Sequence, residues 1–242
     1  MKCIAFTRRC LKEILRDPLN LAFGLGFPVV LLALLSAIQA NIPVALFEIR
    51  HLAPGIAVFG LSFMTLFAAT LVARDRESAF LQRLYTTPMK ASDFIAGYLL
   101  PVIPISLGQC IVTFLFAILL GLPVDGNLFW AILGTLPVAV FYIALGLACG
   151  SLLNVKQVGG ICGALLTNLS AWLSGVWFDL ELVGGFFQKL ANALPFVHAV
   201  ELERALLAGD PGNALAHLLP VLAYGAGTML LAVLCFLRQM KQ

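Results

Sequence analysis

The sequence has very little charge for its length. Only 11% of its 242 residues are Asp, Glu, Lys or Arg, whereas 61% belong to the hydrophobic set. A soluble domain typically carries about 25% charged residues, so this chain could not cover a water-exposed surface with solvated groups. We therefore expect a membrane protein, and no nucleic acid among its partners.

Motifs for several kinds of chemistry are also missing. The sequence has no G-x-x-x-x-G-K-[ST] motif, so the chain does not hydrolyse ATP with a P-loop. None of its six cysteines forms a C-x-x-C pair, which argues against a disulfide framework and against a zinc site. We expect no metal and no cofactor bound by this chain itself.

Long uncharged runs dominate what is present. A helix needs roughly 20 apolar residues to cross the hydrocarbon of a bilayer, and its backbone must satisfy its own hydrogen bonds there. The sequence therefore predicts an all-α integral membrane protein with six transmembrane helices in a single domain, residues 1–242. The expected spans are 19–38, 52–73, 94–121, 127–153, 157–178 and 213–237.

The lysines and arginines orient these spans. Twelve of the fifteen lie in residues 1–18, in the loop 74–93, at Lys156 and in the C-terminal tail, and the other three are Arg50, Lys189 and Arg204. Because cytoplasmic loops are enriched in Lys and Arg, both termini are expected in the cytoplasm of a cell (inner or plasma) membrane.

Residues 1–18 are expected to form an interfacial helix that stays in the mature chain. The apolar positions Cys3, Phe6, Cys10 and Ile14 share one face, and Arg8, Lys12 and Arg16 share another. A basic amphipathic helix of this kind lies along the inner leaflet and makes membrane lipid an expected partner. A cleaved signal peptide is the alternative, but the charged lead is long and no A-x-A site follows.

The predicted spans contain no charged residue, which argues against a proton-driven carrier built from this chain alone. Energy for transport would then come from a partner. Two glycine clusters, Gly146-x-x-x-Gly150 and the run 159–163, are expected to permit close helix packing.

A few polar residues could suggest chemistry near the end of the chain. His198, Glu201 and Glu203 might be considered metal ligands, but the favoured interpretation is an interfacial helix with solvated charges. Ser174 with His217 could suggest an intramembrane protease, which would require these side chains to converge.

The loop 74–93 is where a soluble partner is expected to bind. Residues 75–85 predict a helix that ends before Pro88. This helix is either a plain connector or a short lever that inserts apolar side chains into the partner.

Two segments resemble the type-2 permeases of ATP-binding-cassette exporters. The first is the run from Arg76 to Pro88, with Ala79 where that family often has glycine. The second is the run from Leu194 to Gly209, with Glu201 where an aspartate is common. Both lie where that six-span family has its cytoplasmic coupling helix and its external re-entrant segment.

The resemblance implies a role for each segment. The coupling loop 74–93 would contact a separate ABC-type ATPase subunit, which holds ATP and Mg, and the segment 179–210 would contain two short re-entrant helices. A second permease copy or homologue would complete a dimer. The implied ATPase-coupling residues are Asp75, Arg76, Glu77, Phe80, Leu81, Arg83 and Leu84, and the implied external residues are Pro195, Glu201 and Arg204.

The expected cargo is hydrophobic or amphipathic, such as a drug, a peptide or a lipid. Scattered polar or aromatic residues in the predicted spans are the candidate pathway: Gln109, Thr167, Asn168, Ser170 and Trp172. Two other functions remain open: a membrane anchor or immunity subunit that binds an ATPase without moving cargo, and an intramembrane enzyme.

Overall fold

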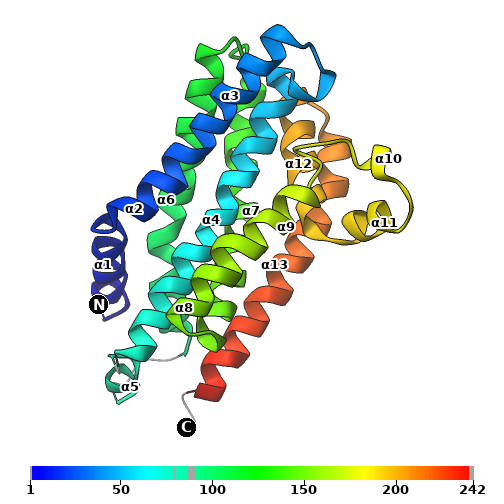
Figure 1. Cartoon of the computed structure of the whole chain (residues 1–242). Helices are drawn as coiled ribbons and strands as arrows, with labels where there is room; N and C mark the ends of the chain where they lie inside the picture. Colours follow the sequence, from blue (N-terminus) through cyan, green and yellow to red (C-terminus); the bar gives the residue numbers. More distant parts are fainter. Residues whose placement is uncertain (1, 79, 87–90, 240–242) are drawn as a thin grey trace.

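The computed structural model describes residues 2–78, 80–86 and 91–239. Within this described part every regular element is a helix, as the sequence predicts. Figure 1 shows long helices running side by side, with α1, α5 and both ends of the chain gathered at one end of the bundle. The placement of both termini at one end is what an even number of crossings requires.

The first part of the chain builds the outer and central layers of the bundle. Its helix α1 buries Phe6, Cys10 and Ile14 on one face, as predicted, while the side chain of Cys3 lies outside the described part. The elements are α1 (Lys2–Leu15), α2 (Pro18–Leu21), the π-helix η1 (Ala22–Gly26), α3 (Phe27–Asn41), the 3-10 helix η2 (Ala45–Phe47) and α4 (Ile49–Glu77).

The second part contains shorter elements between three long helices. Local signals mark several of their ends: the Asp125 carboxylate caps α7, and Asn154 with Gln157 forms a capping box at α8. The elements are α5 (Phe80–Tyr85), α6 (Ala91–Leu119), α7 (Gly126–Leu152), α8 (Val155–Val158), the π-helix η3 (Gly159–Leu166), α9 (Thr167–Trp172), α10 (Leu180–Val183), α11 (Gly185–Ala193), α12 (Pro195–Ala208) and α13 (Pro211–Gln239).

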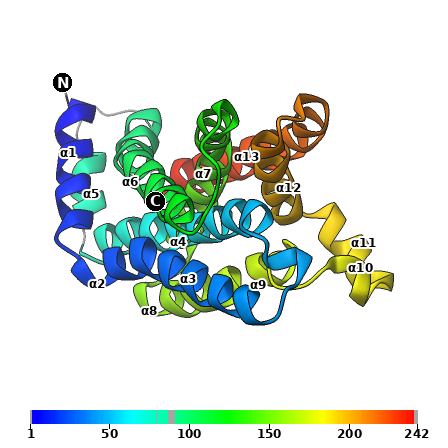
Figure 2. The ribbon, with the colours of Figure 1, turned by 90° about the horizontal axis from the view of Figure 1, so that it is seen from above.

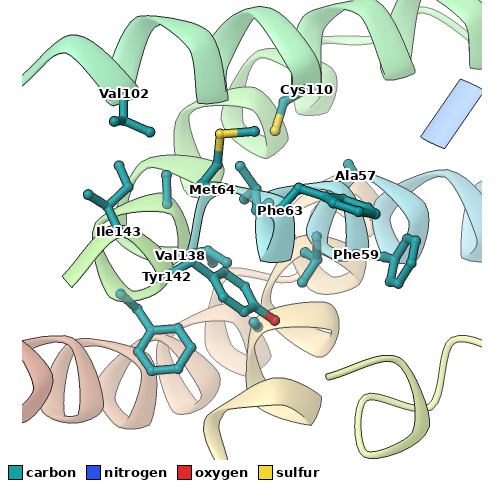
Figure 3. Packing of buried hydrophobic residues seen from close by; sticks show 14 of the residues in the cluster. Ala57, Phe59, Phe63, Met64, Val102, Cys110, Val138, Tyr142 and Ile143 are labelled. Carbon is teal, nitrogen blue, oxygen red and sulfur yellow. The ribbon is translucent and has the colours of Figure 1, made fainter. Parts of the chain in front are cut away.

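Helix α4 is the centre of the molecule. Its most apolar stretch is 94% buried, against 17% for the corresponding stretch of α13. Figure 2 shows α6 on one side of α4 and α8 and α9 on the other. In Figure 3, Met64 of α4 points toward Cys110 of α6, and Val138 and Tyr142 of α7 lie beside the same helix. Movement of α4 would therefore disturb contacts with most of the bundle.

The contact between α4 and α7 depends on two glycines. A Cβ at Gly146 would lie 2.4 Å from the Thr65 carbonyl oxygen, and one at Gly150 would lie 2.5 Å from that of Ala69. The predicted close packing at Gly146-x-x-x-Gly150 is confirmed. Within this subunit, Gly159 and Gly160 pack against no neighbouring helix, because a Cβ at either would meet no other atom of the described chain within 4 Å, whereas a Cβ at Gly163 would lie 3.4 Å from the Leu66 side chain.

Among the residues that the structure describes, five helical segments are long and apolar enough to cross a membrane. They are Ala22–Asn41, Ile49–Glu77, Ser92–Leu119, Gly126–Leu152 and Pro211–Gln239. The expected span 157–178 is helical only to Trp172, and it is divided among α8, η3 and α9. From Val155 to Trp172 such a helix extends about 27 Å, slightly less than the roughly 30 Å of a bilayer core. Three glycines weaken a regular helix at this point, so a count of six crossings stays a prediction.

The segment 179–210 contains the short α10 followed by two longer helices, α11 and α12. Gly209 adopts a left-handed conformation, with φ of 76°, at the end of α12, and α13 begins two residues later. This sharp turn lays α12 against the start of α13, while α10 and α11 project from the side of the bundle in Figure 1.

Candidate coupling site at the end of α4

The last turn of α4 joins several other parts of the bundle. Residues 74–77, which we name the α4 hub, are consecutive, and the side chain of each contacts a different partner. Because α4 then leads directly toward α5, any force on α5 would reach these contacts first.

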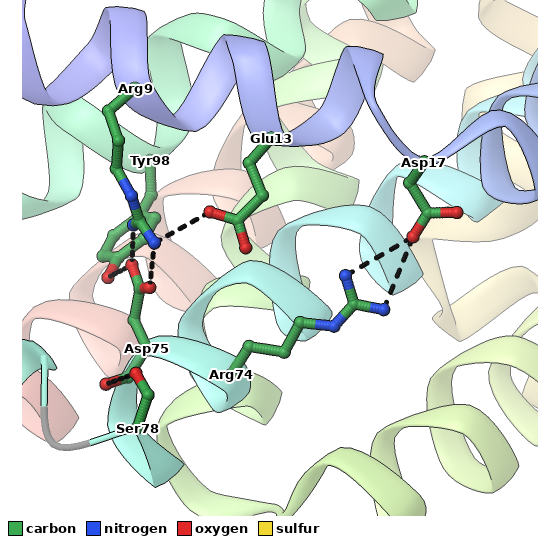
Figure 4. A network of polar contacts seen from close by, with 7 residues as sticks. All are labelled: Arg9, Glu13, Asp17, Arg74, Asp75, Ser78 and Tyr98. Atoms are coloured by element: carbon green, nitrogen blue, oxygen red, sulfur yellow. Dashed lines mark hydrogen bonds and ion pairs between the residues drawn. The ribbon is translucent and has the colours of Figure 1, made fainter.

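Asp75 connects the α4 hub to α1 and α6. Figure 4 shows its carboxylate bonded to the Arg9 guanidinium through both oxygens and to the Tyr98 hydroxyl, which donates at 2.7 Å. The Asp75 side chain is 2% exposed and the Arg9 side chain is 37% exposed. Burial lowers the pKa of Arg9, but the hydrogen bond and charge of Asp75 outweigh it and raise that pKa further above its usual value. Arg9 therefore stays protonated.

The other three hub residues hold the ends of neighbouring helices. Arg74 lies 3.4 Å from the Asp17 carboxylate, between α1 and α2. Arg76 donates to the carbonyl oxygens of Ser151 and Leu153, which the end of α7 leaves without helical partners. Glu77 accepts from the Val155 amide at 2.9 Å, at the start of α8. The hub thus ties four helical ends to α4.

Helix α5 presents only part of its surface to a partner. Leu81 is buried in the core, and Phe80 and Leu84 are half-buried, with the Arg9 guanidinium 4.3 Å from the centre of the Phe80 ring. Arg83 is exposed. Asp75 and Leu81 therefore hold this region in shape, and Arg83 with Glu77 offers the accessible charge. Ala79, Thr87 and Pro88 lie outside the described residues.

The five candidate pathway residues do not gather in this chain. Gln109 of α6 is buried and donates to the Thr113 hydroxyl. The other four candidates lie in α9, which packs against α4 on the side away from α6. Thr167 and Ser170 are buried there, and Asn168 and Trp172 are exposed. A shared pathway would need a second subunit or a different conformation.

Two of the three predicted external residues, Glu201 and Arg204, line a cavity of about 460 Å³. Pro195 is the first residue of α12, and Arg204 pairs with Glu201 at 2.8 Å. The Arg204 guanidinium also donates to the carbonyl oxygens of His51 and Gly175, both at 3.3 Å. Arg204 thus fixes α12 to the start of α4 and to the segment after α9.

Most of the residues considered for metal binding or proteolysis line this same cavity, but Glu203 does not. All three histidines of the chain, together with Ser174 and Glu201, contribute to its wall. Ser174 donates to the Ala171 carbonyl, whereas Nδ1 of His198 lies 2.9 Å from Nδ1 of His217. No hydrogen bond joins Ser174 to an imidazole in the part of the chain that the structure describes, and no cluster of three or more potential ligands there could hold a metal. The side chains that an intramembrane enzyme would need therefore do not all come together among the described residues.

Glu203 overturns the expectation of solvated charges on α12. Its carboxyl is fully buried, and neither oxygen has a hydrogen-bond partner among the described residues. It occupies space left by Gly134, where a Cβ would lie 3.0 Å from its Oε1. Burial raises the pKa of Glu203 well above its usual value, which favours the neutral acid in the folded protein. Val200 and Leu207, on the same face of α12 as Glu203, are also buried. This helical periodicity could have indicated from the sequence that Glu203 is buried.

Replacing Glu203 with glutamine should make stability less dependent on pH. A carboxyl whose folded pKa is raised stabilises the fold below its unfolded pKa, and that contribution is lost as pH rises toward the folded pKa. The Glu203→Gln variant should match wild type near pH 5 and exceed its melting temperature by about 3–6 °C near pH 8. Glu201→Gln, which removes an ion-paired carboxylate, is the matched control and should show no such gain. Identical pH curves for wild type and Glu203→Gln would contradict the prediction.

Comparison with known proteins agrees with this architecture. Residues 1–207 match the ABC-2 type transporter family. The chain is similar to the ABC transporter G family member 20 of Dictyostelium discoideum, with 26% identity over 167 residues, which is 66% of this chain and 22% of that protein. It is also similar to the daunorubicin resistance ABC transporter permease protein DrrB1 of Streptomyces coeruleorubidus, with 25% identity over 166 residues, which is 66% of this chain and 57% of that protein.

Neither alignment reaches two thirds of the relative's own length. The family match, by contrast, covers most of the chain and includes α1, the α4 hub, α5 and nearly all of α12. Together with several long apolar helices in its described part, this makes the chain a multi-pass membrane protein that belongs to the ABC-2 type transporter family.

Proposed function

We propose that this chain is the transmembrane subunit of an ATP-driven exporter. A separate ABC-type ATPase subunit binds and hydrolyses ATP with Mg, and it docks at α5 and the exposed side of the α4 hub. Both termini lie on the cytoplasmic side of a cell membrane, with α11 and α12 near the opposite side. The cargo moves outward and is hydrophobic or amphipathic.

The α4 hub is the observation that carries this proposal. Its four side chains connect α4 to the junction of α1 and α2, to α6, to the end of α7 and to the start of α8. A partner that displaces α5 would move all of these contacts together, because α4 is the central helix of the bundle. A plain connector would need no such convergence of buried and charged contacts.

The cargo class is supported by the helices and by one relative. Apart from Glu203, the described core of the bundle offers mostly apolar surface, which suits cargo with a large hydrophobic part. The similar protein DrrB1 is named for resistance to daunorubicin. For this chain we propose the broader class of drug, peptide or lipid.

A second permease subunit, identical or homologous, would complete the transporter. Gly159 and Gly160 of η3 present an open surface, and Leu165 and Trp172 nearby are 54% and 51% exposed. A neighbouring helix could approach closely there. Asn168 is exposed on the following helix, so this face would place two of the candidate pathway residues, Asn168 and Trp172, at the contact between subunits.

The test measures ATPase binding and ATP hydrolysis separately. The chain would be co-expressed with the ABC-type ATPase encoded nearest to it and reconstituted in nanodiscs. Arg83→Glu should weaken ATPase binding at least about tenfold, since it reverses an exposed charge at the docking surface. Glu77→Ala should leave more of the binding intact but reduce hydrolysis, because it cuts the link from the hub to α8. Leu84→Asp should weaken assembly.

Lys189→Glu is the matched charge reversal on α11 and should behave as wild type. If no ATPase binds, or if Arg83→Glu and Glu77→Ala both match Lys189→Glu, the docking proposal is wrong. A complex that hydrolyses ATP without response to any amphipathic cargo would instead favour the membrane-anchor alternative.

A further inference from the structure

Three cations lie in a row along the exposed face of α1 and the turn that follows it. Arg8, Lys12 and Arg16 are each four residues apart, which puts them on one side of a helix. All three are exposed, and no other described residue forms an ion pair or hydrogen bond with their side chains. Arg9 and Arg74, close by, are already paired with carboxylates. The row therefore carries charge that the protein itself leaves uncompensated.

This row lines an open cavity of about 1,020 Å³ between α1 and the end of α4. Arg9 and Arg74 complete a wall of five cations, against the two carboxylates of Glu13 and Asp17. Both carboxylates are already occupied: Glu13 lies 2.8 Å from Arg9, and Asp17 accepts from Arg74 and from the Asn20 amide. The cavity is thus a positively charged recess with no free acid to neutralise it.

An apolar surface begins directly after this recess. Phe23, Phe27, Val30 and Leu34 follow one another at helical spacing and are 52%, 36%, 62% and 55% exposed. The first of them is five residues beyond Pro18, which itself lines the cavity, so about 7 Å of helix separates the charged part from the apolar part. Ile4, which also lines the cavity, is 71% exposed. A free soluble anion would use the cations and leave this apolar surface bare.

We propose that the recess binds the phosphate head group of an anionic phospholipid of the inner leaflet, with its acyl chains along the exposed face of η1 and α3. Charge complementarity selects an anion, and the adjoining apolar face selects one that carries hydrocarbon chains. The assignment to the inner leaflet rests on the orientation given under Proposed function. The bound lipid would hold α1, with Arg9, beside Arg74 at the end of α4, and so would support the α4 hub.

The test uses the full permease without any ATPase. Native mass spectrometry in detergent would follow binding of phosphatidylglycerol in the presence of phosphatidylcholine. Wild type should retain phosphatidylglycerol selectively. The triple variant Arg8→Gln, Lys12→Gln, Arg16→Gln should bind it about 100-fold more weakly, since each basic side chain near an anionic lipid surface contributes roughly a factor of five.

The matched control neutralises three exposed cations elsewhere: Arg50→Gln, Lys189→Gln, Arg238→Gln. It removes the same net charge and should retain phosphatidylglycerol as wild type does. Equal loss in both triple variants, or no preference of wild type for phosphatidylglycerol, would overturn the proposal. Glycerol 3-phosphate at millimolar concentration should not displace the lipid, and displacement would show a site for free phosphate instead. None of these outcomes depends on whether an ATPase docks at α5.

Discussion

Replacing Arg9 with glutamine is expected to destabilise the protein more than replacing Asp75 with asparagine, although both changes remove the same ion pair. The difference follows from burial, because the Asp75 side chain is 2% exposed and that of Arg9 is 37% exposed. Arg9→Gln leaves a buried carboxylate with the Tyr98 hydroxyl as its remaining side-chain donor. Losing one member of a buried pair costs about 3–5 kcal/mol.

Asp75→Asn leaves the Arg9 cation without Asp75, but that cation remains partly hydrated. The Arg9 guanidinium still reaches water and still lies 2.8 Å from Glu13, so we expect a cost of about 1–2 kcal/mol. For a chain of this size these costs correspond to losses in melting temperature of about 6–20 °C for Arg9→Gln and about 2–8 °C for Asp75→Asn. Thermal unfolding of the purified permease would measure both.

The double variant tests whether the cost of Arg9→Gln comes from the carboxylate that it leaves unpaired. Arg9→Gln with Asp75→Asn should be more stable than Arg9→Gln alone, because it no longer buries an unpaired charge. Arg8→Gln, one residue away, exposed and without a partner among the described residues, is the matched control and should change the melting temperature little. If Asp75→Asn proves as costly as Arg9→Gln, the carboxylate is not the buried partner that the structure shows.

Replacing Gly146 with alanine should disrupt the contact between α4 and α7. The added methyl would lie 2.4 Å from the Thr65 carbonyl oxygen and 2.9 Å from the Ala68 Cβ. Neither is the end of a flexible side chain, so the two helices would have to separate. Overpacking of this kind costs about 1–3 kcal/mol, and separation would also weaken the Thr65 hydrogen bond to the Tyr142 carbonyl, now 3.0 Å long.

Gly227→Ala in α13 is the matched control for this change. A Cβ at Gly227 would meet nothing within 4 Å, and alanine favours helix over glycine by roughly 1 kcal/mol. We expect Gly146→Ala to lower the melting temperature by about 3–10 °C and Gly227→Ala to leave it unchanged or raise it. Equal melting temperatures for the two variants would mean that α4 and α7 are not so tightly packed.

Features that depend on the hydropathy of neighbouring residues along the chain could be predicted from the sequence. Hydropathy over a window of about 20 residues identified the long helices, because crossing a bilayer requires length and apolar character rather than any particular partner. The amphipathic pattern of α1 likewise predicted which of its described faces is buried. The span 157–178 was harder to predict, because hydropathy does not register the glycines that divide it into α8, η3 and α9.

Which polar residues contact each other could be seen only once the helices were packed together. Arg9 and Asp75 are 66 positions apart, and Arg76 and Leu153 are 77 apart, so no spacing rule along the chain could pair them. The same holds for Glu203, whose burial follows from the packing of α12 against α7 at Gly134. Apolar character is a property of each residue, but a hydrogen bond or an ion pair belongs to two groups whose separation is set only when the helices pack. That is why the membrane helices could be read from the sequence and the α4 hub could not.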